Sequence, residues 1–242
     1  MSKQEHSDLT PDRLTPVFDR VLLARPLSVD VEWPRWLRGI ERKRRSLAAK
    51  ASTAPDTLIR QATLSSFRLE GIDASEADLE EAVTPTRNRR LFRSGQRTRM
   101  RNHLAILFSV ERLLRKRHPL KAAHVVRWYT VIGGGLSTTS LAEPEMERIE
   151  RVVRRINSPQ MRLQPALQEI AKLHCDLLAD PMFPSFNGIL ARLLLRVHLG
   201  HCGLPPVVFD PAVDRQRFSD PNLLLPRLLE LVDRSLDGLL AN

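Results

Sequence analysis

The segment from residue 187 to residue 203 carries apolar side chains on almost every face of a helix. The apolar positions are Ile189, Leu190, Leu193, Leu194, Leu195 and Val197. Only Arg192 and Arg196 interrupt them with charge. This pattern is typical of a helix buried in the middle of a domain, and Gly203 with the two prolines that follow marks its end. We therefore expect the rest of the chain to pack around this helix.

Apolar residues at helical spacing, separated by proline and glycine, predict further helices on both sides of this segment. The predicted ranges are 34–50, 56–70, a short helix capped by Ser75 and ending at 83, 99–117, 119–132, 144–157, 165–180 and 221–240. Residues 1–30 are predicted to be extended, and no strand pattern or repeat is found. The sequence therefore predicts an all-α fold. Residues 1–54 would form an N-terminal extension with a helix, and residues 55–242 the helical domain.

Asn187 and Gly188 open the buried helix. The first backbone N–H groups of a helix have no partner within it, and the helix dipole favours negative charge there. Two interpretations stay open from these residues alone: a loop that joins two core helices, or an anion-binding site.

Residues 181–192 read PMFPSFNGILAR. They resemble the signature of the Fic (Fido) domain family, H-P-F-x-D/E-G-N-G-R-x-x-R. In that family the signature is followed by a leucine-rich helix and then by a Gly-x-Pro-Pro exit. The matching residues are Phe183, Asn187, Gly188, Arg192 and the run Gly203-Leu204-Pro205-Pro206. The resemblance implies a Fic-like helical domain in which Asn187, Gly188 and Arg192 bind the phosphates of a nucleotide.

The signature departs from the family at its chemically active positions. Pro181 stands where the family has its catalytic histidine, and a one-residue insertion, which would place Asp180-Pro181 there, supplies no histidine either. Ser185 stands at the position of the metal-binding acid, and Ile189 at that of the first phosphate-binding arginine. The nearby His174, His198 and His201 do not occupy the histidine position; we expect them to be packed or on helix surfaces.

Residues 66–71, SFRLEG, resemble the inhibitory motif of the same family, S/T-x-x-x-E-G/N. In family members that carry this motif before the core, its glutamate pairs with the last arginine of the signature. The resemblance therefore implies that Ser66, Glu70 and Gly71 form an inhibitory segment and that Glu70 contacts Arg192.

Fic proteins typically transfer AMP from ATP to a hydroxyl group of a target protein, using the histidine as base and the acid to hold Mg²⁺. Because base and metal ligand are both missing here, we expect impaired adenylylation and a function in binding a nucleotide or a protein. The bound nucleotide would be ATP or another nucleotide, and the protein would bind it without a well-formed magnesium site. Two alternatives stay open: a nucleotidyl or phosphoryl transferase with altered chemistry, and a basic helical module that binds nucleic acid.

The net charge of +10 is what raises the nucleic-acid alternative. Two arginine-rich runs contribute much of it, Arg42–Arg45 and Arg87–Arg101. Aromatic residues make up only 5% of the chain, too few for a base-stacking surface, so a solvated basic face competes with this interpretation. The two cysteines, Cys175 and Cys202, argue against a disulfide scaffold. We see no signal peptide or membrane-spanning run and expect a cytoplasmic protein.

Overall fold

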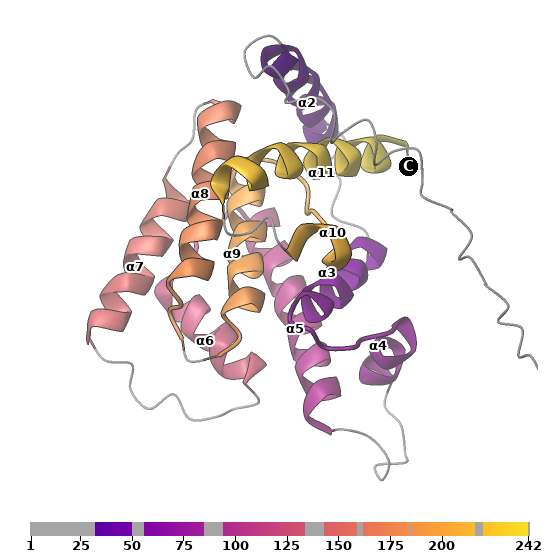
Figure 1. Cartoon of the computed structure of the whole chain (residues 1–242), viewed down its shortest axis with the longest axis vertical. Helices are drawn as coiled ribbons and strands as arrows, with labels where there is room; N and C mark the ends of the chain where they lie inside the picture. Colours follow the sequence, from indigo (N-terminus) through magenta and orange to yellow (C-terminus); the bar gives the residue numbers. More distant parts are fainter. Residues whose placement is uncertain are drawn as a thin grey trace, which may run out of the picture. The chain divides into compact units, whose positions relative to one another are not determined.

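The computed structural model describes residues 32–49, 56–84, 94–133, 143–158, 162–183, 185–215 and 220–241. The chain forms two units, Met1–Arg38 and Gly39–Asn242. The helices are α2 (Glu32–Ala49), α3 (Asp56–Leu69), α4 (Glu76–Val83), α5 (Ser94–Arg115), α6 (Ala122–Ile132), α7 (Glu143–Asn157), α8 (Leu163–Ala179), α9 (Asn187–His201), α10 (Pro211–Asp214) and α11 (Pro221–Ala241) (Figure 1). No strand occurs in these ranges, so the predicted all-α fold is confirmed.

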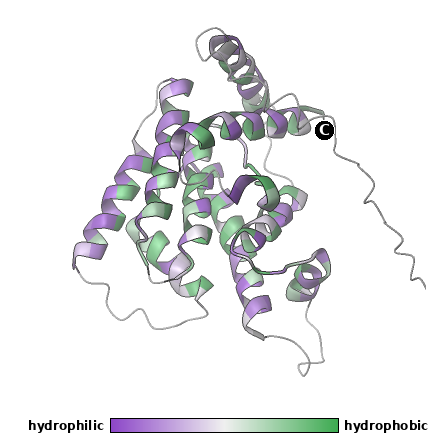
Figure 2. Ribbon diagram, viewed as in Figure 1, coloured by the Kyte–Doolittle hydropathy of each residue, from purple (hydrophilic) through white to green (hydrophobic). Residues whose placement is uncertain are grey.

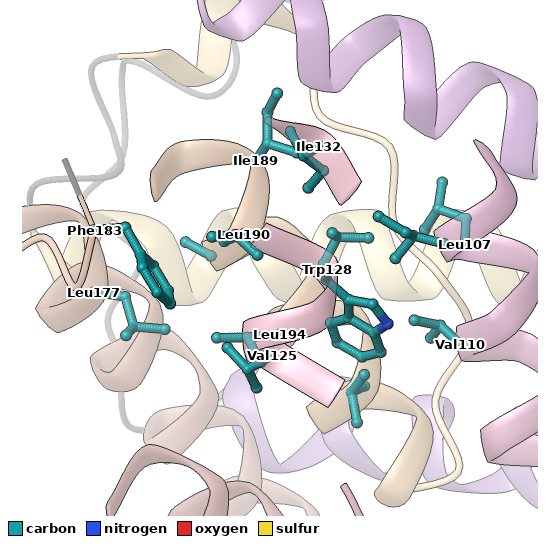
Figure 3. Packing of buried hydrophobic residues seen from close by; sticks show 14 of the residues in the cluster. Leu107, Val110, Val125, Trp128, Ile132, Leu177, Phe183, Ile189, Leu190 and Leu194 are labelled. Carbon is teal, nitrogen blue, oxygen red and sulfur yellow. The ribbon is translucent and has the colours of Figure 1, made fainter. Parts of the chain in front are cut away.

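Helix α9 is the centre of the larger unit, as its apolar pattern predicts. Nine of its fifteen residues are buried, and α3, α5, α6, α7 and α8 all pack against it. Figure 3 shows side chains from α5, α6, α8 and α9 gathered in the core, with Leu190 and Leu194 near its middle. At Gly200 a Cβ atom would lie 2.3 Å from a methyl group of Leu114, so any larger residue there would require the Leu114 side chain to move.

The outer helices have one buried and one exposed face. Along α7, hydrophobic and hydrophilic residues alternate (Figure 2), and its buried residues are Ile149, Val152, Val153 and Ile156. The predicted start of α4 is also present: Ser75 accepts a hydrogen bond from the Asp78 amide, and the Asp78 carboxylate accepts one from the Ser75 amide. Such a reciprocal cap satisfies two N–H groups at the helix start.

The sequence pattern missed the one-turn helix α10. Its start is capped by Asp210, whose carboxylate accepts from the Ala212 amide. Its last residue, Asp214, is fully buried and paired with Arg227 of α11 at 2.7 Å. Four residues are too few to show a periodic pattern; the signal in the sequence is Asp210 followed by Pro211, which is typical of a helix start.

Two predictions concern residues outside the described ranges. They are the extended segment 1–30 and the first part of the basic run, residues 87–93. The division at residue 54 stays a prediction, while residues 39–49 of α2 belong to the larger unit. None of the helices in the described ranges is long and apolar enough to cross a membrane.

Candidate anion site at the start of helix α9

The first turn of α9 is shaped by the residue before it. Phe186 has φ 60° and ψ 18°, a left-handed conformation that usually favours glycine. Glycine is also what the Fic signature carries at this position. The backbone amide of Phe183 donates to Asn187 Oδ1 at 3.0 Å, and Asn187 Nδ2 donates back to the Phe183 carbonyl. The Asn187 side chain therefore fixes the loop that leads into α9.

The end of α3 brings a carboxylate to this first turn. Gly71 has φ +76°, and the Ile72 amide donates to the Phe67 carbonyl at 3.1 Å, while the Gly71 amide donates to the Arg68 carbonyl at 3.0 Å. This is the Schellman arrangement, in which a left-handed residue ends a helix. It stops α3 at Leu69 and leaves Glu70 at the helix end, facing α9.

Glu70 and Arg192 form the ion pair that the resemblance predicts. Arg192 Nη2 lies 2.7 Å from Glu70 Oε1 and 2.9 Å from the Ser66 carbonyl, and Arg192 Nε donates to Ser66 Oγ at 2.8 Å. A Cβ atom on Gly188 would lie 2.0 Å from Glu70 Oε1. Only glycine at 188 lets the carboxylate reach the helix start. We call this group, Ser66, Glu70, Phe186, Gly188 and Arg192, the α9 mouth.

Arg192 is the only cation buried at the α9 mouth among the described residues. Its side chain is 10% exposed, and that of Glu70 is 28% exposed. Burial lowers the pKa of Arg192, and the Glu70 carboxylate opposes that effect. Burial, together with the charge of Arg192, lowers the pKa of both His103 and His174 to about 3. Both imidazoles are therefore neutral near pH 7, and Glu70 alone balances the guanidinium.

The positions that would carry Fic chemistry hold other side chains. Pro181 is exposed, and its carbonyl accepts from Arg148 Nη1 at 3.1 Å. Asp180, the alternative residue for that position, pairs with Arg148 at 2.6 Å. Ser185 is exposed, and Ile189 is fully buried in the core. None of the three histidines near the signature takes the place of the missing base, because His174 and His198 are buried and His201 lies at the other end of α9.

A magnesium ion does not fit the side chains at the α9 mouth. Mg²⁺ is usually held by one or two carboxylates together with substrate phosphates. Ser185 offers only a hydroxyl, and the Glu70 carboxylate is bound to Arg192. In the described part of the chain, no three histidine, cysteine, aspartate or glutamate side chains are grouped as metal ligands.

Aromatic contacts around the mouth were not foreseen from the sequence. Tyr129 of α6 stacks on Phe183 with ring centroids 4.1 Å apart, and the Arg99 guanidinium lies 5.0 Å from the centre of the Phe186 ring. The match of Phe183 to the Fic signature was the one indication in the sequence that an aromatic residue lies at the mouth. The two partners lie more than 50 residues away in sequence and carry no motif.

The basic runs are partly paired with acidic residues. Arg44 and Arg45 both bind Glu41, and Arg97 forms an ion pair with Glu81. These contacts reduce the charge that the two runs could offer to a nucleic acid. Both cysteines are free; Cys175 is buried and Cys202 is partly exposed.

The fold has close counterparts among solved structures. A fragment of Fic-1 from C. elegans is similar with a TM-score of 0.66 and 17% identity, over 93% of this chain and 77% of that one. A Fic domain containing signaling protein from Bacteroides thetaiotaomicron gives 0.64 and 17%, over 84% of this chain and 96% of that one. The chain has a Fic-like fold. No protein-family model matches its sequence, and no match was found among curated proteins.

Proposed function

We propose that this chain is a Fic-fold protein that binds the phosphates of a nucleotide at the α9 mouth and transfers AMP weakly or not at all. Glu70 would compete with the nucleotide for Arg192 and the start of α9. The observation that carries the proposal is the position of the Glu70 carboxylate, in contact with Gly188 and bonded to Arg192.

A carboxylate at a helix start satisfies the same groups that a phosphate would. Both are anions that accept from free N–H groups and from a guanidinium, and both gain from the helix dipole. Because 28% of the Glu70 side chain is exposed, it could leave the site toward solvent. Arg192 is held in place by Ser66, so it would remain oriented for an incoming phosphate.

The weak or absent transfer follows from the side chains at the catalytic positions. The Pro181 side chain can neither accept nor donate a proton. A general acid–base group contributes about 10²–10⁴-fold to the rate, so its absence should cost that much. Ser185 replaces the metal-binding acid, and the buried Ile189 offers no charge to the phosphates. Restoring a histidine at position 181 alone should therefore leave transfer undetectable.

The test is nucleotide binding in Glu70→Ala, measured by titration calorimetry with ATP. We expect binding about tenfold tighter than in the wild type, since a competing charged contact of roughly 1.5–3 kcal/mol is removed. Adding Arg192→Leu should abolish the gain. Glu80→Ala is the matched control, because Glu80 is also a surface glutamate paired with an arginine, Arg60, but lies outside the mouth.

The same variants should be incubated with labelled ATP and magnesium. Label on the protein or on an added protein target in Glu70→Ala would contradict the weak-transfer part of the proposal. Equal ATP affinity in the wild type and in Glu70→Ala would contradict the binding part.

A further inference from the structure

A second candidate site lies at the opposite end of α9. A groove of about 610 Å³ is lined by the ends of α5, α7 and α9 and by α2. Its charged and polar side chains are Arg44, Arg117, His118, Asn157, Ser158 and His201. None of the described residues that line it carries a carboxylate. We call it the basic groove; along a helix of fifteen residues, it lies about 22 Å from the α9 mouth.

Two helices end at the basic groove with the same backbone arrangement but different residues. At the end of α9, Gly203 has φ +69°, and the Leu204 amide donates to the Leu199 carbonyl at 2.9 Å. At the end of α5, Arg117 has φ +52°, and the His118 amide donates to the Leu113 carbonyl at 3.0 Å. Both are Schellman ends, where the left-handed position favours glycine.

Arginine at this position is therefore strained relative to glycine. A left-handed backbone brings the Cβ of an L-residue too close to the following carbonyl. The Gly203 and Gly71 ends avoid that contact, and the Arg117 end does not. An outlier of this kind is a reason to ask what its side chain does. Arg117 places a guanidinium at the wall of the basic groove.

The charges around Arg117 are not balanced. Within the described ranges, no acidic side chain forms an ion pair with Arg115, Lys116, Arg117 or Lys121. Burial and then the positive charges of Lys121, Arg127 and His118 lower the pKa of His124 on the neighbouring helix. In contrast, Arg44 is positioned by Glu41 and by the Cys202 carbonyl, to which its Nη1 donates at 2.9 Å. The groove thus combines one fixed arginine, Arg44, with one arginine that has no acidic partner among the described residues, Arg117.

We propose that the basic groove binds a small molecule that carries two or more phosphate groups, with Arg117 as a direct contact. Guanidinium groups suit phosphate because they donate paired hydrogen bonds to it. The groove volume falls within the range of small-molecule sites, roughly 300–1,000 Å³. No phenylalanine, tyrosine or tryptophan lines it, which disfavours the base stacking used by single-stranded nucleic acids. This site is separate from the one proposed above and does not depend on it.

The test is titration calorimetry of the full chain with inorganic tripolyphosphate at fixed salt, combined with thermal unfolding without ligand. In Arg117→Gly we expect tripolyphosphate to bind about tenfold more weakly, because one charged contact is lost. The same variant should unfold at a higher temperature, because glycine removes the backbone strain. A variant that is more stable and binds less well separates a binding role from a structural one.

Arg112→Gln is the matched control, since it removes one exposed positive charge from α5 outside the groove. We expect it to change neither binding nor the unfolding temperature by much. In an Arg192→Leu background, Arg117→Gly should still weaken tripolyphosphate binding by the same factor, which separates this site from the α9 mouth.

Four results would overturn the proposal. They are unchanged binding in Arg117→Gly, equal losses in Arg117→Gly and Arg112→Gln, an unfolding temperature that falls in Arg117→Gly, and an absence of tripolyphosphate binding. Binding of a duplex DNA oligonucleotide that is much tighter than that of tripolyphosphate and indifferent to Arg117 would also count against it. That outcome would assign the positive surface to nucleic acid.

Discussion

Arg192 and Arg196 lie one turn apart on α9, and each reaches a glutamate that belongs to another part of the fold. Arg192 donates to Ser66 and to Glu70, which stays 28% exposed. Arg196 pairs with Glu111 of α5 at 2.6 Å, and the two side chains are 11% and 9% exposed. Arg196 Nη1 is buried without a hydrogen-bond partner among the described residues. Both arginines line a cavity of about 40 Å³.

The difference between the two pairs separates an exchangeable contact from a fixed one. At the α9 mouth, the arginine is held by Ser66 and the anion can be replaced from solvent. At the second pair, Glu111 is only 9% exposed, so this carboxylate is harder to replace from solvent than Glu70. Removing one partner of an enclosed pair leaves a charge in a medium that solvates it poorly. An arginine–glutamate pair thus favours ligand binding at the α9 mouth and stability at Arg196 and Glu111.

Glu111→Leu should have the largest effect on stability. It leaves the Arg196 charge buried without its partner, and such a loss typically costs about 3–5 kcal/mol. We expect the free energy of unfolding, measured by urea denaturation, to fall by about that amount. Glu111→Leu combined with Arg196→Leu should recover part of the loss, because the isolated charge is gone. Single effects that simply add would show that the pair is not coupled.

His103 links the two pairs, because it lines the same cavity and donates to or accepts from Thr63 at 3.1 Å. Burial, assisted by Arg192, lowers the pKa of His103 to about 3, from about 6.5 in the unfolded chain. The unfolded state therefore binds a proton more readily than the native state. This contribution to stability is complete above pH 6.5 and is lost as the pH falls toward 3.

Urea denaturation between pH 7 and pH 4 should show this loss. One histidine contributes a slope of up to about 1.4 kcal/mol per pH unit, or about 2 kcal/mol by pH 5. His103→Gln cannot take up the proton, so its stability should fall less steeply than that of the wild type. Parallel slopes in the two proteins would mean that His103 is not held neutral.

Glu70→Ala should cost less than Glu111→Leu. We expect about 1–2 kcal/mol, between the roughly 0–1 kcal/mol of an exposed ion pair and the larger cost of a buried one, because water can reach the mouth. A cycle with Arg192→Leu, measured by urea denaturation, would give the coupling between the two side chains. A loss equal to that of Glu111→Leu would remove the distinction between an exchangeable and a fixed pair.

The contrast also marks how far the sequence alone could lead. The apolar pattern of residues 187–203 predicted the central helix, and proline and glycine marked most helix ends to within a few residues. The Glu70–Arg192 pair was predictable only through a resemblance to family motifs at both ends. Glu111 and Arg196 are 85 residues apart and belong to no motif, so nothing in the sequence indicated their contact.

Local backbone geometry was the other part that could not be foreseen. The left-handed Phe186 and Arg117 depart from the preference for glycine, and residue preferences alone would not place them there. The hydrogen bonds between the Asn187 side chain and the Phe183 backbone were not foreseen either. Such uses depend on the path of a short loop, which residue spacing does not define. The nucleotide-binding and inhibitory roles stay predictions.

Phe186→Asn should have the smallest effect and tests how the α9 mouth keeps its shape. Asparagine adopts the left-handed conformation more easily than phenylalanine, which favours the variant by about 1 kcal/mol. The variant loses the contact between the ring and Arg99, which is worth about 0.5–1 kcal/mol. The two terms nearly cancel, but the ring is also partly buried against the core, so urea denaturation should show a net loss of about 0.5–1 kcal/mol. Arg99→Gln should lower stability in the wild type and have no effect in the Phe186→Asn background.

Because Asn187 still fixes the loop, nucleotide affinity in Glu70→Ala should not change when Phe186→Asn is added. A loss of more than about 2 kcal/mol would show that the ring, rather than the Asn187 side chain, holds the mouth in place.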